Sequence, residues 1–251
     1  MLNIQDNKYW PFIKEVGEAV IAVLILFLLM RLVLGSPMPL VVVTSGSMMH
    51  ENNDWNIWLL DHQIVQETID GFPMTGGFSK GDIIVTRRPD VTLGDIVIYK
   101  RDEWNNDRAK DPIIHRVVGI VYIENWEVSK VVGTISEVDE ADFREVYIPI
   151  MKNCSQNIEV QFDNKRECPY PVKGKGDGSG SMKFYITKGD NNDIIDQYPY
   201  KQSGGRIVQD KTGSIALPVS DDQLYAEAWI KIPWLGYIKL WMVDIISIFT
   251  G

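Results

Sequence analysis

The chain contains little cysteine and little positive charge, and each shortage excludes a class of protein. Its 251 residues include two cysteines, Cys154 and Cys168, which are too few for a disulfide-stapled fold and lack the CxxC spacing of a zinc or redox site. The two residues could form one bridge or remain free thiols. The formal net charge of -9 argues against a nucleic-acid partner, because binding to phosphate groups requires a basic surface.

Histidine is also scarce, which limits the metal chemistry that the chain can support. The three histidines, His50, His62 and His115, do not occur at the HExxH spacing of a zinc peptidase. The acidic run at residues 189–196 carries three carboxylates but lacks the glycine and the glutamate of an EF-hand loop. We therefore expect no metal and no organic cofactor.

One long apolar run lies near the N-terminus, at residues 16–34, and predicts a transmembrane anchor. As an α-helix this run would rise about 28 Å, just enough to cross the hydrocarbon core of a bilayer. Glu18 and Arg31 fall near its ends, where charged side chains can reach the interface. A cleaved secretory signal is the alternative, because Val33-x-Gly35 resembles a cleavage site. We favour the anchor, because Arg31 would sit awkwardly between an apolar core and a cleavage site.

The remaining sequence predicts a mainly β fold that is interrupted by an insertion. Short β-branched runs form two blocks, at residues 36–122 and 182–240. Residues 123–181, between the blocks, are expected to form an inserted β-rich subdomain. The strand candidates are residues 41–44, 81–86, 94–99, 113–122, 146–148, 158–162, 182–187, 206–208 and 214–217, and a glycine-rich linker is expected at 174–180. A Gly-Asp turn opens each of the candidates at 81–86 and 94–99, and residues 50–79 are expected to form a loop or short helix.

Both ends of the chain lie outside these blocks. Residues 1–15 form an N-terminal tail before the apolar run, and residues 241–251 form an apolar tail that is too short to span a membrane. Together with Trp229 and Trp234, the C-terminal tail could lie on the membrane face as an aromatic belt. It could equally pack as an ordinary strand and helix.

Ser47 is the candidate nucleophile, in the sequence VVVTSGSMM. It lies 13 residues beyond the apolar run, a stretch that reaches at most about 45 Å when extended, so its hydroxyl would act close to a bilayer. A serine hydroxyl needs a base to remove its proton and a carboxylate to orient that base. His115 and an aspartate of the acidic run can supply these groups, although a lone histidine in a strand is more often structural.

The surroundings of these residues resemble the type I signal peptidases in several places and in the same chain order. SGSM at Ser47 resembles the nucleophile box of that family, in which the serine before the methionine attacks. IHRVV at His115 resembles the box of the archaeal and endoplasmic-reticulum branch, whose base is histidine where the bacterial branch has lysine. KGDNN at Asp190 is similar to the family's acidic box, which ends in a second aspartate six residues later, here Asp196.

Two further segments extend the resemblance, which covers residues 36–120 and 183–238. GDIV, within the strand candidate 94–99, resembles the family's connecting box. PWLGY at residues 233–237 looks like the proline-aromatic-glycine segment near the family's C-terminus. The chain departs from the pattern in its long segment before residue 81, in its large insertion, and in His50, which stands where a proline is common.

The resemblance implies a role for each residue of the candidate site. Ser47 would be the nucleophile and His115 the general base, with Asp196 as the orienter and Asp190 in support. The backbone N–H of Ser47 and the hydroxyl of Ser45 would stabilise the oxyanion, because developing negative charge needs preorganised donors.

Three assignments have plainer alternatives. Ser45 could serve only the local turn. Met48 would line the substrate pocket, but an ordinary core methionine would look the same in the sequence. Asp193 is interpreted as a solvated loop residue.

The expected protein is a membrane-anchored serine endopeptidase that cleaves signal peptides from exported preproteins, with a signal-peptidase-like β-sheet catalytic domain. The expected partners are preprotein signal peptides, the lipid bilayer and the protein-export machinery. We expect a single-pass protein of an archaeal plasma membrane with its catalytic domain on the extracytoplasmic side. An archaeal membrane is favoured over the endoplasmic reticulum, because the insertion and the chain length are unlike the compact eukaryotic subunit.

Two other functions remain open at this point. The first is an anchored peptidase with a Ser–Lys dyad, in which Lys80 or Lys100 would be the base. The second is an anchored binding or assembly protein that keeps the fold but not the reaction.

Overall fold

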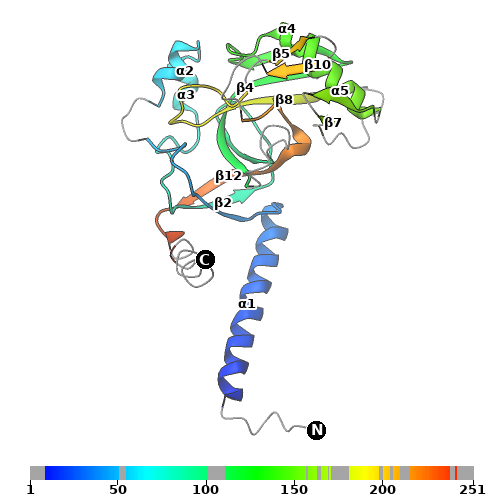
Figure 1. Cartoon of the computed structure of the whole chain (residues 1–251). Helices are drawn as coiled ribbons and strands as arrows, with labels where there is room; N and C mark the ends of the chain where they lie inside the picture. Colours follow the sequence, from blue (N-terminus) through cyan, green and yellow to red (C-terminus); the bar gives the residue numbers. More distant parts are fainter. Residues whose placement is uncertain are drawn as a thin grey trace.

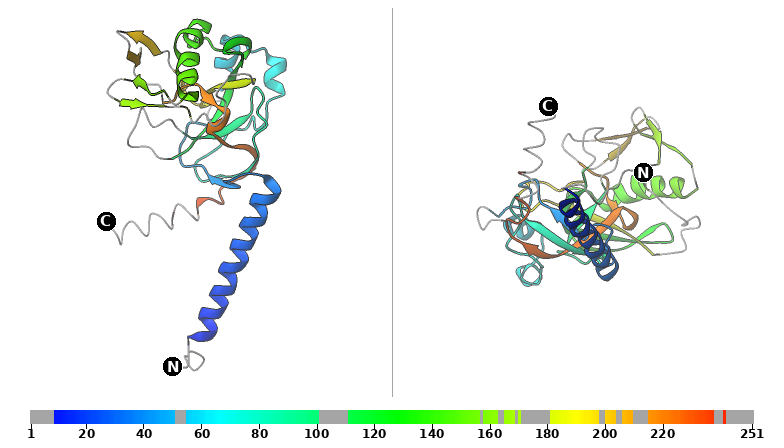
Figure 2. Two further views of the ribbon diagram at one scale, coloured as in Figure 1. Left: turned by 90° about the vertical axis from the view of Figure 1, so that its right-hand side faces the viewer. Right: turned by 90° about the horizontal axis from the view of Figure 1, so that it is seen from below.

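The computed structural model describes residues 9–50, 55–100, 111–156, 158–162, 165–168, 170, 181–197, 200–203, 206–209, 215–237 and 241. Within these residues the fold is a mostly antiparallel half-barrel sheet with one long apolar helix at its N-terminal end. The helix projects away from the β body in the two side views (Figure 1 and the left view of Figure 2).

Helix α1 (Trp10–Leu34) is formed by the apolar run and begins six residues earlier than the predicted anchor. A proline in its first turn suits a helix start, and Gly35 ends the helix in the left-handed region, at φ 62°. None of its residues is buried against the body. Its length and composition fit a single membrane span or a signal sequence.

A set of polar contacts joins the end of α1 to the sheet. The backbone N–H of Arg88 donates to the carbonyl of Leu34 (2.8 Å). The hydroxyls of Ser36 and Thr86 lie 2.7 Å apart, and the Thr86 hydroxyl also donates to the carbonyl of Met38 (2.6 Å). Because Ser36 and Thr86 are buried, these bonds hold the body close to the end of the helix.

The main sheet has the strand order β1-β2-β12-β3-β4-β8-β11, with β5 paired to β4. All its pairings are antiparallel. Most of the predicted strands are confirmed within two residues at each end. Strand β12, which includes Trp229, was not among the strand candidates. The strands are β1 (Leu40–Val42), β2 (Ile83–Arg87), β3 (Ile96–Tyr99), β4 (Ile113–Glu124), β5 (Glu127–Gly133), β8 (Met182–Lys188), β11 (Val219–Ser220) and β12 (Leu224–Ile232).

Gly-Asp turns open β2 and β3, as the sequence predicts. Gly81 and Gly94 both have φ 91°, which disfavours any residue with a Cβ atom. A Cβ at Gly94 would come within 2.0 Å of the Phe72 ring. The carboxylate of Asp95 caps its turn by accepting the Thr92 backbone N–H (2.7 Å).

The segment between β1 and β2 was predicted as a loop or short helix, and it contains two short helices. These are α2 (Ile57–Asp61) and α3 (Gln66–Asp70). They bury Leu59 and Ile69 in the largest hydrophobic cluster. The same segment brings Trp55 and residues 73–78 to the site described below.

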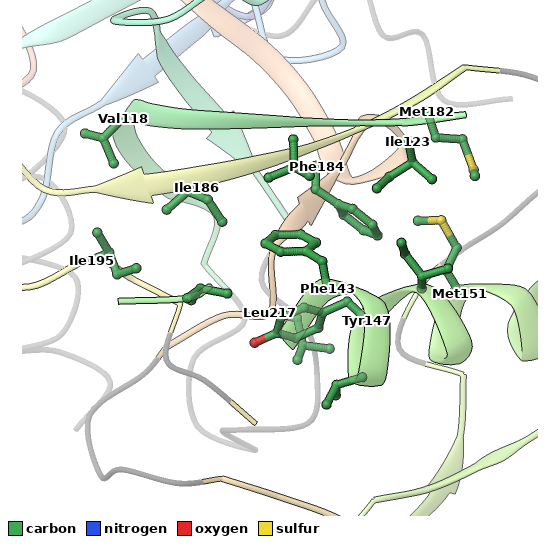
Figure 3. Packing of buried hydrophobic residues seen from close by; sticks show 14 of the residues in the cluster. Val118, Ile123, Phe143, Tyr147, Met151, Met182, Phe184, Ile186, Ile195 and Leu217 are labelled. Carbon is green, nitrogen blue, oxygen red and sulfur yellow. The ribbon is translucent and has the colours of Figure 1, made fainter. Parts of the chain in front are cut away.

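The predicted strand at 146–148 is wrong, because residues 140–155 are helical. They form α4 (Glu140–Asp142), the π-helical turn η2 (Phe143–Tyr147) and α5 (Ile148–Ser155). Phe143, Tyr147 and Met151 recur every four residues and therefore share one helix face. Figure 3 shows this face packed against Phe184 and Met182 of β8 and Ile123 of β4. A helix that buries three large side chains outweighs the local β preference of a short apolar run.

A second sheet has the order β7-β6-β10-β9, and it crosses the predicted domain boundary. Residues 200–209 were assigned to the main block, but their strands join those of the insertion. Strand β10 pairs in parallel with β6. The strands are β6 (Val160–Phe162), β7 (Lys165–Glu167), β9 (Tyr200–Ser203) and β10 (Arg206–Gln209).

The insertion is therefore a mixed helical and β unit rather than a β-rich subdomain. Cys154 is buried and Cys168 exposed, and both are free thiols. Burial, with a hydrogen bond that the thiol donates to Cys168, raises the pKa of Cys154. The predicted strand at 214–217 is wrong for its described residues 215–217, and β11 follows at 219–220. The linker at 174–180 and, apart from Trp241, the tail at 241–251 lie outside the described residues.

Candidate active site

Ser47 lies in a tight turn that follows β1, and two other segments hold this turn. The turn is closed by the Met49 backbone N–H, which donates to the Gly46 carbonyl (3.1 Å). From the acidic loop after β8, Asn191 donates its backbone N–H to the Ser47 carbonyl (2.8 Å) and its side-chain amide to the Gly46 carbonyl (3.2 Å). On the other side, the Phe78 backbone N–H donates to the Met48 carbonyl (2.7 Å).

His115 approaches Ser47 from the central strand β4. Its Nε2 lies 2.9 Å from the Ser47 Oγ, and the imidazole is 4 % exposed. Its Nδ1 lies 2.6 Å from Oδ2 of Asp196. A carboxylate accepts, so Nδ1 carries the hydrogen and Nε2 is free to accept the hydroxyl proton of Ser47.

Asp196 is held by more than the imidazole. Its Oδ2 also accepts from the hydroxyls of Thr187 (2.6 Å) and Tyr99 (2.9 Å), which project from β8 and β3. Its backbone N–H donates to the Thr187 carbonyl (2.8 Å), which returns the acidic loop to the sheet. Asp196 is 2 % exposed, so this buried carboxylate is both oriented and stabilised as an anion.

The site therefore brings together Ser47, His115 and Asp196, and it separates Asp190 from them. Asp190 pairs with Arg116, whose Nε and Nη2 donate to its two carboxylate oxygens at 2.8 and 2.7 Å. Because His115 and Arg116 are neighbours on a strand, their side chains lie on opposite faces of the sheet. Asp190 supports the site through the turn rather than by touching His115.

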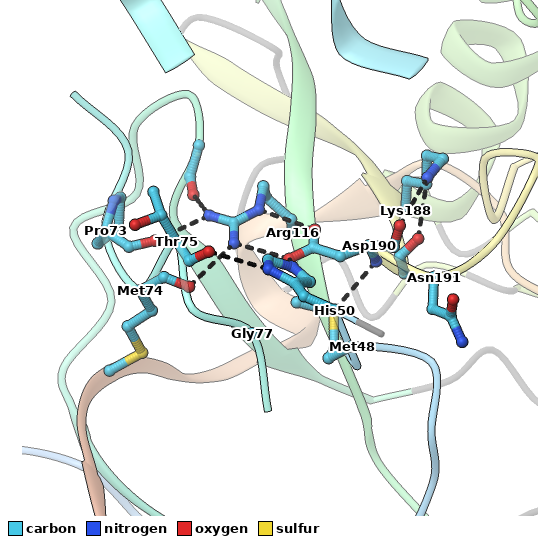
Figure 4. A network of polar contacts seen from close by, with 12 residues as sticks. Met48, His50, Pro73, Met74, Thr75, Gly77, Arg116, Lys188, Asp190 and Asn191 are labelled. Carbon is cyan, nitrogen blue, oxygen red and sulfur yellow. Dashed lines mark hydrogen bonds and ion pairs between the residues drawn. The ribbon is translucent and has the colours of Figure 1, made fainter. Parts of the chain in front are cut away.

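Arg116 is fully buried and uses every donor that it has. Its remaining N–H groups donate to the carbonyls of Gly94 (2.8 Å), Pro73 (2.9 Å) and Met74 (3.4 Å), as Figure 4 shows. Burial acts to raise the pKa of the Asp190 carboxyl. The charge of Arg116 and hydrogen bonds from His50 and Arg116 outweigh burial, so this pKa lies below its ordinary value.

Ser45 and Met48 differ in how they fit their predicted roles. The Ser45 hydroxyl is exposed and lies 3.2 Å from the Ser47 Oγ, on the solvent side of the nucleophile. Met48 is 1 % exposed, packs in the core with Phe78 and Ile84, and does not line the cavity beside the nucleophile. Met48 therefore lies where the alternative of a core methionine expects it, with its side chain turned inward to accept the Asp190 N–H (3.4 Å).

An open cavity of about 360 Å³ lies beside the Ser47 hydroxyl. Its walls are largely β-branched side chains, and its polar edge carries Thr44 and the acidic Asp111. The lining residues are Val41, Val42, Thr44, Ser45, Ser47, Ile98, Asp111, Pro112, Ile113, Ile114, His115, Asn192 and Ile215. An extended chain could enter between β1 and the start of β4 and reach the nucleophile.

No family model matches the chain. A search of curated proteins also finds no match.

The other candidate residues differ from His115 in their surroundings. Lys80 and Lys100 have exposed side chains, whereas the Ser47 hydroxyl is bonded to an imidazole. Lys188 is buried, with its ammonium on the Gly189 carbonyl (3.0 Å), and burial lowers its pKa against the opposing charges of Asp190 and Asp196. Asp193 is exposed, as predicted. Among the described residues, no group of three or more metal-ligating side chains occurs.

Several supporting residues carried no role in the sequence-based prediction. Tyr99 and Thr187 brace the orienting carboxylate, and Asn191 braces the nucleophile turn. Their strands and loop were predicted, but pairing across β3, β4 and β8 brings them together. His50, which contacts Asp190, was noted in the sequence only because it stands where a proline is common in the signal peptidases that the sequence resembles.

Proposed function

We propose that the protein is a membrane-anchored serine endopeptidase that cleaves signal peptides from exported preproteins. The observation that carries the proposal is the hydrogen-bonded chain from the Ser47 Oγ through His115 to Asp196. Such a chain activates a hydroxyl for attack on an acyl carbon. The type I signal-peptidase motifs around these residues indicate the substrate class.

In the acylation step, the Ser47 Oγ attacks the carbonyl carbon of the scissile bond and its proton passes to Nε2 of His115. Asp196 stabilises the imidazolium that forms, with Thr187 and Tyr99 holding the carboxylate. The imidazolium then donates its proton to the leaving amine nitrogen as the C–N bond breaks. Water, deprotonated by the same imidazole, hydrolyses the acyl-serine and returns the site to its starting state.

The oxyanion of the tetrahedral intermediate would be stabilised next to Ser45. This hydroxyl lies 3.2 Å from the Ser47 Oγ and is exposed toward the cavity. The backbone N–H of Ser47 is the second donor in this proposal. Both groups belong to the turn that Asn191 and Phe78 hold, so the donors are positioned before the charge develops.

The substrate would bind as an extended chain beside β1, which is the edge strand of the sheet. The branched walls of the cavity favour small side chains next to the scissile bond. The short connection from α1 keeps this groove near the membrane. Exposed Trp234 and Leu235 follow β12, on the side of the body from which α1 projects (Figure 1), and suit the interface.

The proposed setting is an archaeal plasma membrane, crossed once by α1, with the β body on the extracytoplasmic side. There the enzyme would meet preproteins as the export machinery delivers them. A cleaved signal sequence remains the alternative role for α1, and mass spectrometry of the protein purified from membranes distinguishes the two. A mature chain that begins after residue 35 would contradict the anchor.

The decisive experiment incubates the purified full-length protein in detergent with a preprotein, and Ser47→Ala provides the matched control. We expect cleavage after a small residue, with loss of cleavage in the variant. Cleavage that survives the Ser47→Ala change would contradict the assigned nucleophile. If neither protein cleaves any preprotein, the anchored binding protein becomes the better interpretation.

A further inference from the structure

His50 is a buried histidine outside the reactive set, and both its ring nitrogens face acceptors. Its side chain is 7 % exposed. Nδ1 lies 2.9 Å from the carbonyl oxygen of Thr75, and Nε2 lies 2.8 Å from Oδ2 of Asp190. Figure 4 shows the ring between these two groups.

The types of these partners determine the charge of the ring. A carbonyl oxygen can only accept, and Asp190, doubly bonded to Arg116, is an anion that can only accept. Both hydrogen bonds therefore require a hydrogen on each nitrogen of His50. A ring that donates at both nitrogens is an imidazolium.

Several charged groups around His50 act on the charge of its imidazole. Arg116 on β4, Lys188 on β8 and Lys231 on β12, which binds the Gly77 carbonyl at 2.8 Å, all oppose an additional positive charge. Asp190 and the Thr75 carbonyl favour it by direct contact. The Trp55 ring stacks on the imidazole at 4.8 Å and excludes solvent from one face.

His50 also connects the segment of the nucleophile turn to the two segments that hold it. It lies three residues after Ser47 on the same strand-to-helix connection. Asp190 precedes Asn191, which binds the Ser47 carbonyl. Thr75 belongs to the segment that ends at Phe78, which binds the Met48 carbonyl.

We propose that His50 is a positioning residue that holds the Ser47 turn only while its imidazole is protonated, so that alkaline pH loosens the nucleophile. The inference rests on the proposed function, in which Ser47 is the attacking residue. When His50 loses a proton, one nitrogen presents a lone pair to an acceptor, and that contact must break. The turn then loses one of its connections to Asp190 or to Thr75.

The predicted consequence is a bell-shaped pH dependence of peptide cleavage in which two histidines act in opposite senses. On the acid side, His115 must lose its proton to act as the base. On the alkaline side, His50 must keep its proton to hold the turn. Each limb should change by about tenfold per pH unit, because one proton controls it.

The kinetic experiment measures kcat and KM against pH for an internally quenched signal-peptide substrate, using the full-length protein in detergent. The variants are His50→Gln, which cannot become charged, and His62→Gln as the matched control. His62 also stacks on a tryptophan, Trp58, but lies away from the nucleophile.

We expect His50→Gln to lower kcat several-fold with little change in KM and to abolish the alkaline limb. The control should keep the profile of the wild type. An alkaline limb that persists unchanged in His50→Gln would overturn the proposal.

A structural measurement tests the inference even if the His50 variant folds poorly. The chain has three histidines, so their ¹⁵N resonances in the wild type can be assigned with single variants. We expect the ¹⁵N shifts of His50 to show hydrogens on both nitrogens while the turn is intact. The amide protons of Asn191 and Phe78 should lose protection from exchange as His50 becomes neutral. A neutral His50 with both amides still protected would contradict the proposal.

The kinetic and the ¹⁵N measurements together distinguish a failure of the proposed function from a failure of the role proposed for His50. A wild-type protein that cleaves nothing, but whose His50 titrates together with the Asn191 and Phe78 amides, contradicts the proposed function and leaves a pH-dependent turn. A wild-type protein that cleaves, with His50 neutral throughout, keeps the proposed function and excludes the regulatory role.

Discussion

The two faces of β4 carry two clusters that are built from the same kinds of group and differ in their chemistry. On one face, His115 lies between the carboxylate of Asp196 and a hydroxyl. On the other face, His50 lies between the carboxylate of Asp190 and a carbonyl. A hydroxyl can donate as well as accept, so the contact with Ser47 requires no second hydrogen on His115. A carbonyl can only accept, so both contacts of His50 are hydrogen bonds only if each of its nitrogens donates.

Access to solvent separates the clusters further. The Ser47–His115 pair opens to the cavity, whereas Arg116 is sealed beneath Trp55 and the 73–78 segment. Removing groups from the first cluster should therefore act directly on the reaction, whereas removing Asp190 from the second should act first on the fold. The predictions below test this difference, from the largest expected effect to the smallest.

His115→Ala should reduce kcat/KM by at least about 10⁴-fold, because the nucleophile loses its base. Cleavage of a quenched peptide measures the effect, and thermal unfolding should show that the variant stays folded. Lys100→Ala and Lys80→Ala serve as controls and should keep full activity. An active His115→Ala enzyme that a lysine substitution inactivates would instead support the Ser–Lys dyad.

Asp190→Asn should lower the free energy of unfolding by about 3–5 kcal/mol, because it leaves the buried charge of Arg116 unpaired. Chemical denaturation in detergent measures the loss. Asp193→Asn, an exposed change in the same loop, should stay within about 0.5 kcal/mol of the wild type. Equal stability of the two variants would show that the Arg116 cluster contributes little to folding.

The same pair has a defined pH dependence. The lowered pKa of Asp190 contributes stability that is fully present above its ordinary value of 3.8 and is lost as the pH falls through the folded-state pKa. Asp190→Asn should lack this part of the acid destabilisation.

Ser45→Ala should lower kcat by about 10²–10³-fold if its hydroxyl stabilises the oxyanion. KM should change little, because the interaction strengthens only in the transition state. Thr44→Val, which changes a neighbouring hydroxyl on the cavity wall, is the matched control. A Ser45→Ala enzyme with wild-type kcat would leave the Ser45 hydroxyl with only a turn role.

Thr187→Val should lower kcat/KM roughly tenfold, because Asp196 loses one of its three side-chain donors. Thr86→Val is the control: Thr86 is equally buried, but it bonds at the end of α1 and should affect stability alone. If the two variants have equal activity, the orientation of Asp196 does not depend on Thr187.

Local patterns predicted those parts of the fold that depend on few distant contacts. The apolar run forms a helix, and glycine with positive φ opens β2 and β3 at the predicted Gly-Asp turns. The prediction of a strand at 146–148 was wrong because the structure of these residues depends on distant contacts. Those residues are apolar enough for either state, and burial of Phe143 against Phe184, across more than 40 positions of sequence, favours the helix.

The candidate site divides in the same way. The residue types and order of Ser47, His115 and Asp196 were readable from the sequence, because the chemistry of a hydroxyl nucleophile demands them. The roles of Tyr99 and Thr187 were not, because a hydroxyl on a strand gains a partner only when the neighbouring strands pair. The sequence also could not predict which way the Met48 side chain points, because this depends on the turn that Phe78 and Asn191 hold.

The sequence by itself determined a long apolar helix and a mostly β body. It also determined which reactive side chains are present: the serine, the three histidines and the three loop carboxylates discussed above. These properties follow from side-chain chemistry and from spacings of a few residues. The tertiary structure decided which carboxylate meets which histidine. It directs Asp196 to His115 and Asp190 to Arg116 and His50, because consecutive residues of a strand face opposite sides of a sheet and the acidic loop reaches both.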